Sequence, residues 1–204
     1  MIDMGEGDLY FYTAQGMIKR TASSEYVTIK SKIGAIKLKE GDRLIAVQAV
    51  DDEKNNLLIT KKGMSICFKG KDIAPIGRMS AGVKAIKLDL GDEVIFAAQA
   101  DSHGEIIVVS DKGYVKKTPV TEYDSQGRGG KGLKTFDFKA NKSNGNCLVF
   151  ADYITQTASY EAVQRNGEKT AFSSNEIVFE SRYSKGSNVV MVLMNNDIVE
   201  VKKA

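Results

Sequence analysis

A glycine-rich segment with two basic residues is the strongest chemical motif of this chain. It reads Gln126-Gly127-Arg128-Gly129-Gly130-Lys131-Gly132. Its glycines would let backbone N–H groups approach an anion, and an arginine can hold a phosphate through two parallel hydrogen bonds. Glycine follows Lys131 where a nucleotide-binding P-loop needs serine or threonine, so the segment predicts phosphate contacts of another kind. Taken alone, the same residues are also typical of a flexible connection between strands.

Two related loops favour the phosphate-binding interpretation. An arginine followed four residues later by a glycine occurs three times, as Arg78 with Gly82, Arg128 with Gly132, and Arg182 with Gly186. Lys84 and Lys185 lie within or just after these loops. Two basic pairs, Lys19-Arg20 and Lys116-Lys117, each end a strand that leads toward such a loop.

If the repeats are arranged radially, these basic residues would lie along a rim as a discontinuous track of positive charge. Such a track binds phosphates without reading sequence, and its curvature favours bent DNA. For any single lysine, a solvated surface position is the competing interpretation. The predicted DNA-binding residues are Gln126, Arg128, Gly129, Gly130, Lys131, Gly132, Arg78, Lys84, Arg182, Lys185, Lys116, Lys117, Lys19 and Arg20.

Net charge is only +3, but the charges are segregated along the chain. From Met17 to Lys39 six basic residues accompany one acidic residue, and from Asn56 to Leu88 seven accompany one. The stretch from Asp89 to Glu105 reverses this, with five acidic residues and no lysine or arginine. A folded repeat would therefore collect each sign on its own face.

Catalytic and metal-dependent functions have little support in the sequence. One histidine and two distant cysteines do not make a zinc site of normal spacing, and no catalytic triad or paired carboxylates are apparent. We expect His103 in an exposed turn, Phe136, Phe138 and Phe150 in the core, and no metal or cofactor. The absence of an apolar run of about eighteen residues argues against a membrane span, and two apolar-flanked cysteines suit a reducing cytoplasm.

An internal repeat of about fifty residues determines the predicted fold. The turn glycines Gly16, Gly63, Gly113 and Gly167 are 47, 50 and 54 residues apart, each between two apolar runs. The glycines of the arginine loops lie 19 residues after the turn glycine of their own copy. We expect positive φ at the turn glycines, because a tight hairpin requires it.

The repeats predict an all-β chain of four blades with almost no helix. Approximate repeats are 8–55, 56–104, 105–156 and 157–204 within one domain, 1–204. In the second copy, strands are expected near 57–60, 64–69, 82–88 and 92–100. A four-stranded unit of this size needs a neighbour to bury both faces, which favours a propeller-like arrangement over a two-sheet sandwich.

With these motifs in hand, the chain resembles the C-terminal DNA-wrapping domain of the A subunit of bacterial type IIA topoisomerases, namely gyrase and topoisomerase IV. Residues 126–132 resemble the gyrase A box, and 77–84 and 181–186 look like its degenerate copies. Two departures, Gly127 in place of a basic residue and the position of the box in the third copy, favour topoisomerase IV slightly.

The resemblance implies a β-pinwheel, a propeller-like disc whose blades exchange strands. It also implies binding and bending of duplex DNA around the rim for an ATP-dependent topoisomerase whose catalytic core lies outside this chain. Implied partners are double-stranded DNA, the B subunit, and the remainder of the A subunit, in the bacterial cytoplasm near the nucleoid. The alternative is a β-propeller scaffold that binds proteins, since a fold alone does not fix function.

Overall fold

The computed structural model describes residues 7–30, 32–193 and 195–204. These residues form β-strands and four short 3-10 helices, with no α-helix among them, which confirms the all-β prediction. The 3-10 helices are η1 (Ser23–Tyr26), η2 (Gly70–Asp72), η3 (Val120–Glu122) and η4 (Ser174–Glu176). Each of them follows the second strand of a repeat.

The strands form four antiparallel sheets, and in each sheet the spatial order of the strands differs from their order in the sequence. In spatial order, the first sheet contains β3 (Leu44–Ala49), β1 (Asp8–Thr13), β2 (Met17–Ala22) and β6 (Val83–Lys84). The second contains β10 (Leu133–Lys134), β5 (Met64–Lys69), β4 (Asn55–Thr60) and β7 (Val94–Ala100). The third contains β11 (Leu148–Ile154), β8 (Glu105–Ser110), β9 (Tyr114–Pro119) and β14 (Ser187–Asn188). The fourth contains β13 (Lys169–Ser173), β12 (Ser159–Gln164) and β15 (Ile198–Lys203).

Adjacent repeats exchange strands. The short strands β6, β10 and β14 come from the second, third and fourth repeats, but each completes the sheet of the repeat before it. The strand expected near 82–88 therefore exists only as Val83–Lys84, and it belongs to the first blade rather than to the second. Just beyond it, the N–H groups of Ala85 and Ile86 donate to the carbonyl of Gly16 at 2.8 and 3.3 Å.

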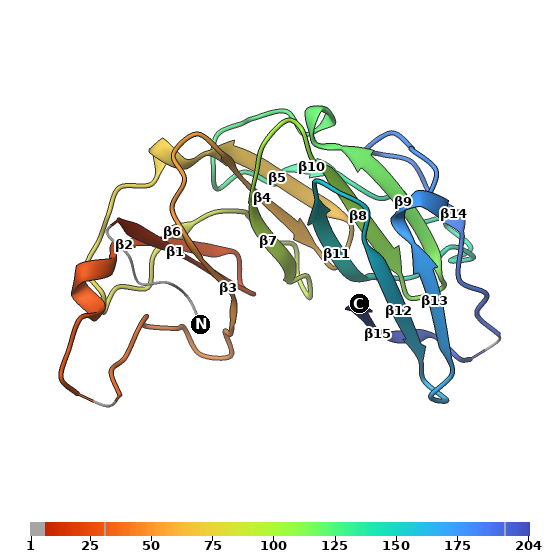
Figure 1. Ribbon diagram of the computed structural model, residues 1–204, viewed down its shortest axis with the longest axis horizontal. Coiled ribbons are helices and arrows are strands. Elements are labelled where there is room, and N and C mark those ends of the chain that lie inside the picture. Colours follow the sequence, from red (N-terminus) through yellow and green to blue (C-terminus); the bar gives the residue numbers. More distant parts are fainter. Residues whose placement is uncertain (1–6, 31, 194) are drawn as a thin grey trace.

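The blades follow one another along an open arc (Figure 1). The long strands β3, β7, β11 and β15 form the inner side of the arc and contact one another in turn, whereas the exchanged strands lie at the outer ends of their sheets. Three sheets have four strands and the fourth has three among the described residues. This is the predicted β-pinwheel of about four blades.

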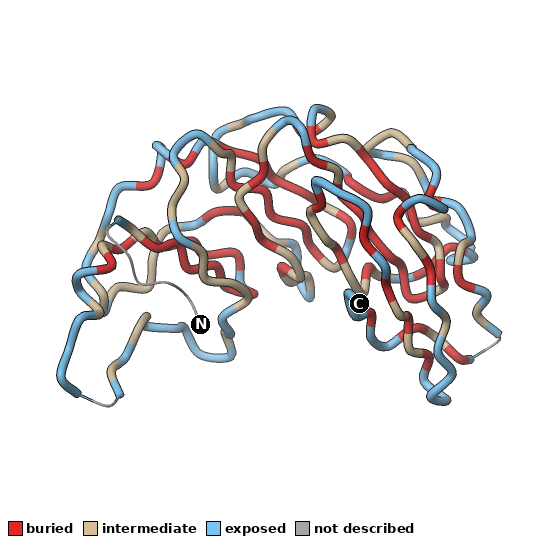
Figure 2. The backbone as a smooth tube through the Cα atoms, viewed as in Figure 1, coloured by how far each residue is buried: buried red, intermediate tan, exposed pale blue. Residues whose placement is uncertain are grey.

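The core lies between neighbouring sheets, which pack face to face, so most blades are covered on both faces. Tyr12 of the first blade packs in one cluster with Leu58 of the second, and Ile106 of the third blade packs with Leu57 of the second. Figure 2 shows buried stretches along the strands and exposed stretches in the connecting loops. The expected core phenylalanines lie there: Phe136 is buried, and Phe138 and Phe150 pack against the clusters.

The turn glycines have the expected backbone conformation. Gly16, Gly63, Gly113 and Gly167 have φ of +76°, +79°, +74° and +88°. Left-handed backbone of this kind is readily adopted by glycine, and it closes each hairpin tightly. The hairpins thereby place the loops that follow their second strands at the outer rim.

Candidate nucleic-acid interface

The glycine-rich segment is an anchored loop on the outer rim between η3 and β10. The N–H of Gln126 donates to the carbonyl of Cys67 at 2.8 Å, and the N–H of Gly129 donates to that of Ala85 at 2.6 Å. The carbonyl of Gly130 accepts from the N–H of Lys87 at 2.8 Å. The loop is therefore held against the preceding repeat, and the Gly129 N–H is already used inside the protein.

The two basic side chains of this loop are exposed. Arg128 donates one Nη1 hydrogen bond to the carbonyl of Lys84 at 3.2 Å, which leaves most of its five N–H donors for another acceptor. Lys131 lies 3.6 Å from Asp89, and both side chains are about two-thirds exposed, at 66% and 67%. Such exposed pairs contribute about 0–1 kcal/mol, so a phosphate can compete for this lysine.

The contact between the box arginine and the preceding repeat occurs three times. Arg78 donates to the carbonyl of Gly34, and Arg182 donates to that of Lys134, as Arg128 does to Lys84. The backbone N–H groups of Arg78 and Arg182 donate to the carboxylates of Glu25 and Glu122, both at 2.6 Å. Arg128 and Arg182 therefore hold the exchanged strands β6 and β10, Arg78 holds a loop of the first repeat, and all three add positive charge to the rim.

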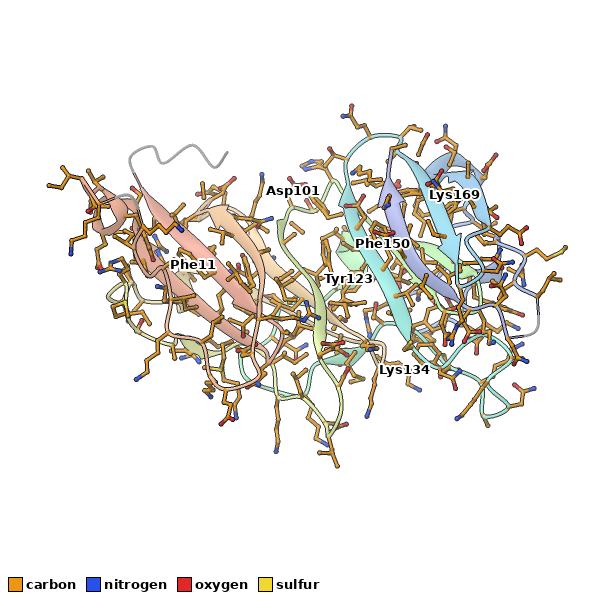
Figure 3. All side chains as sticks on the ribbon, turned by 90° about the horizontal axis from the view of Figure 1, so that it is seen from below. Phe11, Asp101, Tyr123, Lys134, Phe150 and Lys169 are labelled. Carbon is orange, nitrogen blue, oxygen red and sulfur yellow. The ribbon has the colours of Figure 1, made fainter. Side chains whose placement is uncertain are left out.

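Four lysines stand exposed beside these arginines. Lys84 and Lys185 were predicted; Lys87 and Lys134 were missed. Lys134 lies two residues after Gly132, as Lys84 lies two after Gly82, so the repeat offset identifies it. Figure 3 shows Lys134 at the border of the molecule, whereas Phe11, Tyr123 and Phe150 lie among the strands. Lys134 pairs with Asp137 at 2.8 Å, and both side chains are at least half exposed.

The expected exposed track fails at Lys19 and Lys116, whose side chains are fully buried. Lys19 Nζ donates to the carbonyls of Ala35 and Arg78, both at 2.7 Å, and lies 4.6 Å from the centre of the Phe11 ring. Lys116 Nζ donates to the carbonyls of Ser181 and Arg182. Burial lowers the pKa of both lysines to about 8. Each ammonium holds an arginine loop from inside and is not placed to contact a phosphate.

Arg20 and Lys117 are also occupied within the protein. Arg20 bonds Asp8 at 2.5 Å and Asp52 at 2.7 Å, and the hydrogen bond to Asp52 raises its pKa. Lys117 Nζ donates to the carbonyl of Ser174 at 3.1 Å and lies 4.2 Å from the centre of the Phe179 ring. The Arg20 side chain is paired within its own repeat and the Lys117 side chain contacts the fourth repeat, and the two side chains are only 15% and 10% exposed.

The buried lysines predict a separation of stability from DNA binding. Lys116→Met leaves the carbonyls of Ser181 and Arg182 without this donor, so we expect the free energy of unfolding to fall by about 1–3 kcal/mol. The apolar chain itself fits, since Ile66 occupies the same repeat position in the second blade. Urea denaturation measures the loss. Lys84→Met, which changes an exposed lysine, should stay within about 0.5 kcal/mol of wild type; equal losses would contradict the assignment.

The remaining candidate groups do not assemble a catalytic or metal site in the part of the chain described. His103 is exposed as expected, with 90% of its side chain accessible, and lies 3.5 Å from Asp101. Burial raises the pKa of the Cys67 and Cys147 thiols to about 11. No group of three metal-ligating side chains occurs among the described residues. None of their helices is long and apolar enough to cross a membrane.

Curated relatives are A subunits of DNA gyrase. The Staphylococcus epidermidis protein is 39% identical over 151 residues, which is 72% of this chain and 17% of the relative. The Staphylococcus aureus protein is 40% identical over 145 residues, or 69% of this chain and 16% of the relative. This chain thus spans about a sixth of the length of these relatives.

Solved structures have the same fold over nearly the whole chain. A C-terminal domain of DNA topoisomerase IV superimposes with a TM-score of 0.88 and 25% identity, covering 98% of this chain and 62% of that one. A DNA gyrase A C-terminal domain superimposes with a TM-score of 0.80 and 23% identity, covering 98% and 67%. The solved neighbours thus include a topoisomerase IV domain and a gyrase domain, and the curated relatives are gyrase subunits, so the slight preference for topoisomerase IV stays a prediction.

A family model adds the last comparison. The model described as "DNA gyrase C-terminal domain, beta-propeller" matches residues 7–51, 57–101 and 104–141. The matched segments cover more than half of the chain and contain the whole glycine-rich segment, residues 126–132. The chain belongs to the DNA gyrase C-terminal domain family.

Proposed function

We propose that this chain binds duplex DNA along its outer rim and bends it, without reading the base sequence. The observation that carries the proposal is the threefold recurrence of a loop at the rim whose arginine donates to a backbone carbonyl of the preceding repeat. Around these loops gather eight basic residues that keep an exposed or half-exposed position: Arg78, Lys84, Lys87, Arg128, Lys131, Lys134, Arg182 and Lys185.

The curvature of the rim supports bending rather than binding alone. A duplex that contacts successive blades must follow the convex side of the arc (Figure 1). Bending 20–30 base pairs by 40–90° requires about 1–6 kcal/mol, which additional phosphate contacts offset. The favourable positions are spread over several blades, so a straight duplex reaches fewer of them than a bent one.

In this proposal the chain presents a bent DNA segment to a catalytic core elsewhere in a type II topoisomerase. Strand cleavage, religation and ATP hydrolysis belong to the B subunit, together with the rest of the A subunit, and the setting is the bacterial cytoplasm at the nucleoid. The family membership and the rim supply the support. The chain's own role is positional, because its exposed charges contact phosphates and form no reactive constellation.

The glycine-rich loop provides the direct test. Arg128→Ala combined with Lys131→Ala removes two of the proposed phosphate contacts, so the slope of log affinity against log salt should decrease in magnitude by about two units. The loss should be the same for unrelated DNA sequences. Bending should fall more than binding, since the other loops still hold a straight segment. Fluorescence transfer between labelled duplex ends measures bending, and anisotropy measures binding.

A matched double variant controls for charge alone. Arg165→Ala with Lys202→Ala also removes one arginine and one lysine, and their side chains are 66% and 57% exposed. Lys202 lies on β15 at the inner side of the arc, away from the rim loops. This control should leave bending unchanged. Equal effects of the two double variants, or unchanged bending by a folded loop variant, would refute a role of the loop and favour the protein-scaffold alternative.

A further inference from the structure

The three arginine loops differ in the partner of the arginine's backbone N–H group. The N–H of Arg78 donates to Oε2 of Glu25, and the N–H of Arg182 donates to Oε2 of Glu122, both at 2.6 Å. The N–H of Arg128 has no hydrogen-bond partner in the part of the chain that the structure describes. A carboxylate oxygen resembles a phosphate oxygen in its charge and in the hydrogen bond that it accepts from a backbone N–H. The two glutamates therefore lie where a loop of this kind would bind an anion.

One position of the repeat supplies these carboxylates. Glu25 and Glu122 each lie nine residues after the turn glycine of their own repeat, in η1 and η3. The second repeat has Asp72 at the same position, in η2. Aspartate is one methylene shorter, and the exposed Asp72 side chain makes no hydrogen bond or ion pair with any described residue. The loop of Arg128, which packs against the second repeat, therefore receives no carboxylate from it.

The space beside the loop backbone agrees with this difference. A Cβ added to Gly77 would lie 4.0 Å from Oε2 of Glu25, whereas a Cβ added to Gly127, at the same repeat position, would meet nothing within 4 Å. Arg128 is exposed, whereas the arginines of the other two loops are half-buried. An anion can thus approach the Arg128 N–H from the solvent.

The side chains of the same loop supply further donors. Arg182 donates from Nε to the carbonyl of Glu122 at 3.0 Å and from Nη1 to the carbonyl of Lys134. Arg128 makes a single side-chain hydrogen bond among the described residues, from Nη1 at 3.2 Å. The other guanidinium donors of Arg128 therefore remain available to an anion bound at this loop.

We propose that the side chain nine residues after the turn glycine determines whether the next arginine loop binds a phosphate through its backbone. Glutamate closes the loops of Arg78 and Arg182, whereas Asp72 leaves the loop of Arg128 open to a phosphodiester oxygen. This inference rests on the proposed function, because the phosphate belongs to duplex DNA at the rim. The closed loops then contact DNA through side chains alone, and the open loop adds a backbone hydrogen bond.

Asp72→Glu tests the proposal without changing a charge. The added methylene lets the carboxylate reach the Arg128 N–H, so affinity for a short duplex should fall about tenfold. The salt slope should keep its wild-type value, because the same lysines and arginines contact phosphates. Asp72→Asn, which keeps the short side chain, is the control and should bind at least as tightly as wild type. Equal weakening by both variants, or unchanged affinity of Asp72→Glu, would overturn the proposal.

Glu122→Asp should produce the opposite change in another loop. Shortening this carboxylate frees the Arg182 N–H, so affinity for the same duplex should rise about three- to tenfold, again without a change in salt slope. Fluorescence anisotropy measures both quantities. A Glu122→Asp protein that folds and binds no more tightly than wild type would contradict the role of this position.

Inorganic phosphate separates the proposal from DNA binding itself. In proton–nitrogen correlation spectra of the DNA-free protein at constant ionic strength, phosphate should shift the Arg128 amide but not the amides of Arg78 and Arg182. Asp72→Glu should abolish the response of Arg128, and Glu122→Asp should create one at Arg182. These responses in a protein that does not bind duplex DNA would refute the proposed function and support the anion site. Equal responses of the three amides, or no response of Arg128, would overturn the inference whatever the DNA affinity.

Discussion

Affinity for duplex DNA should fall by about 10⁴ between roughly 50 and 200 mM salt, with a slope of log affinity against log salt of about −7. The slope follows from the eight rim residues Arg78, Lys84, Lys87, Arg128, Lys131, Lys134, Arg182 and Lys185, each displacing about 0.9 counterion when it contacts a phosphate. Fluorescence anisotropy on short duplexes at several salt concentrations measures it directly.

The same slope shows whether the basic residues with little exposure also contact phosphates. If Lys19, Arg20, Lys116 and Lys117 also contacted phosphates, the slope would steepen to about −11. Two duplexes of unrelated sequence should give the same slope, because phosphates carry no base identity. Binding that is independent of salt, or that is strong for only one sequence, would contradict a rim that acts through phosphate contacts.

The repeat and its hairpins are predictable because their signals are local. A turn glycine between two apolar runs needs only its own neighbours to adopt positive φ, and all four turn glycines do so. The glycines of the arginine loops behave alike, with φ of +83°, +76° and +71° at Gly82, Gly132 and Gly186. Strand exchange is different, since the apolar pattern around Val83 is the same whether it pairs within its own repeat or with β2.

Whether a basic side chain is buried or exposed depends on hydrogen-bond partners far away in the sequence, which the sequence pattern does not identify. In a sheet with one solvated face, a lysine in a strand would be expected to point outward. Here the sheets are covered on both faces, so Lys19 and Lys116 are inside and their ammonium groups need acceptors. Those acceptors are carbonyls of loops 59 and 65 residues away in the sequence, of Arg78 and Ser181. Ile66 at the equivalent position of the second blade shows that the repeat does not require a lysine there.

Among the glycines of the segment 126–132, we expect some to be required for stability and others to tolerate a side chain. Gly132 has φ of +76°, and a Cβ there would lie 2.1 Å from the carbonyl oxygen of Ser65, which is backbone of β5 and cannot move aside. Gly132→Ala should therefore lower the free energy of unfolding by about 3–5 kcal/mol, through left-handed strain and displacement of β10. Denaturant unfolding measures the loss, and proteolysis should increase near residue 133 if β10 detaches.

Gly127 is the matched comparison within the same loop. A Cβ there meets nothing within 4 Å, and its φ is not in the left-handed region. Gly127→Ala should change stability by no more than about 0.5 kcal/mol. If the loop contacts phosphates closely, this substitution should instead weaken DNA binding, because the methyl group stands between the backbone and the duplex. A stable Gly132→Ala protein would show that the exchanged strand does not depend on the close approach at Ser65, and that the box glycines serve DNA alone.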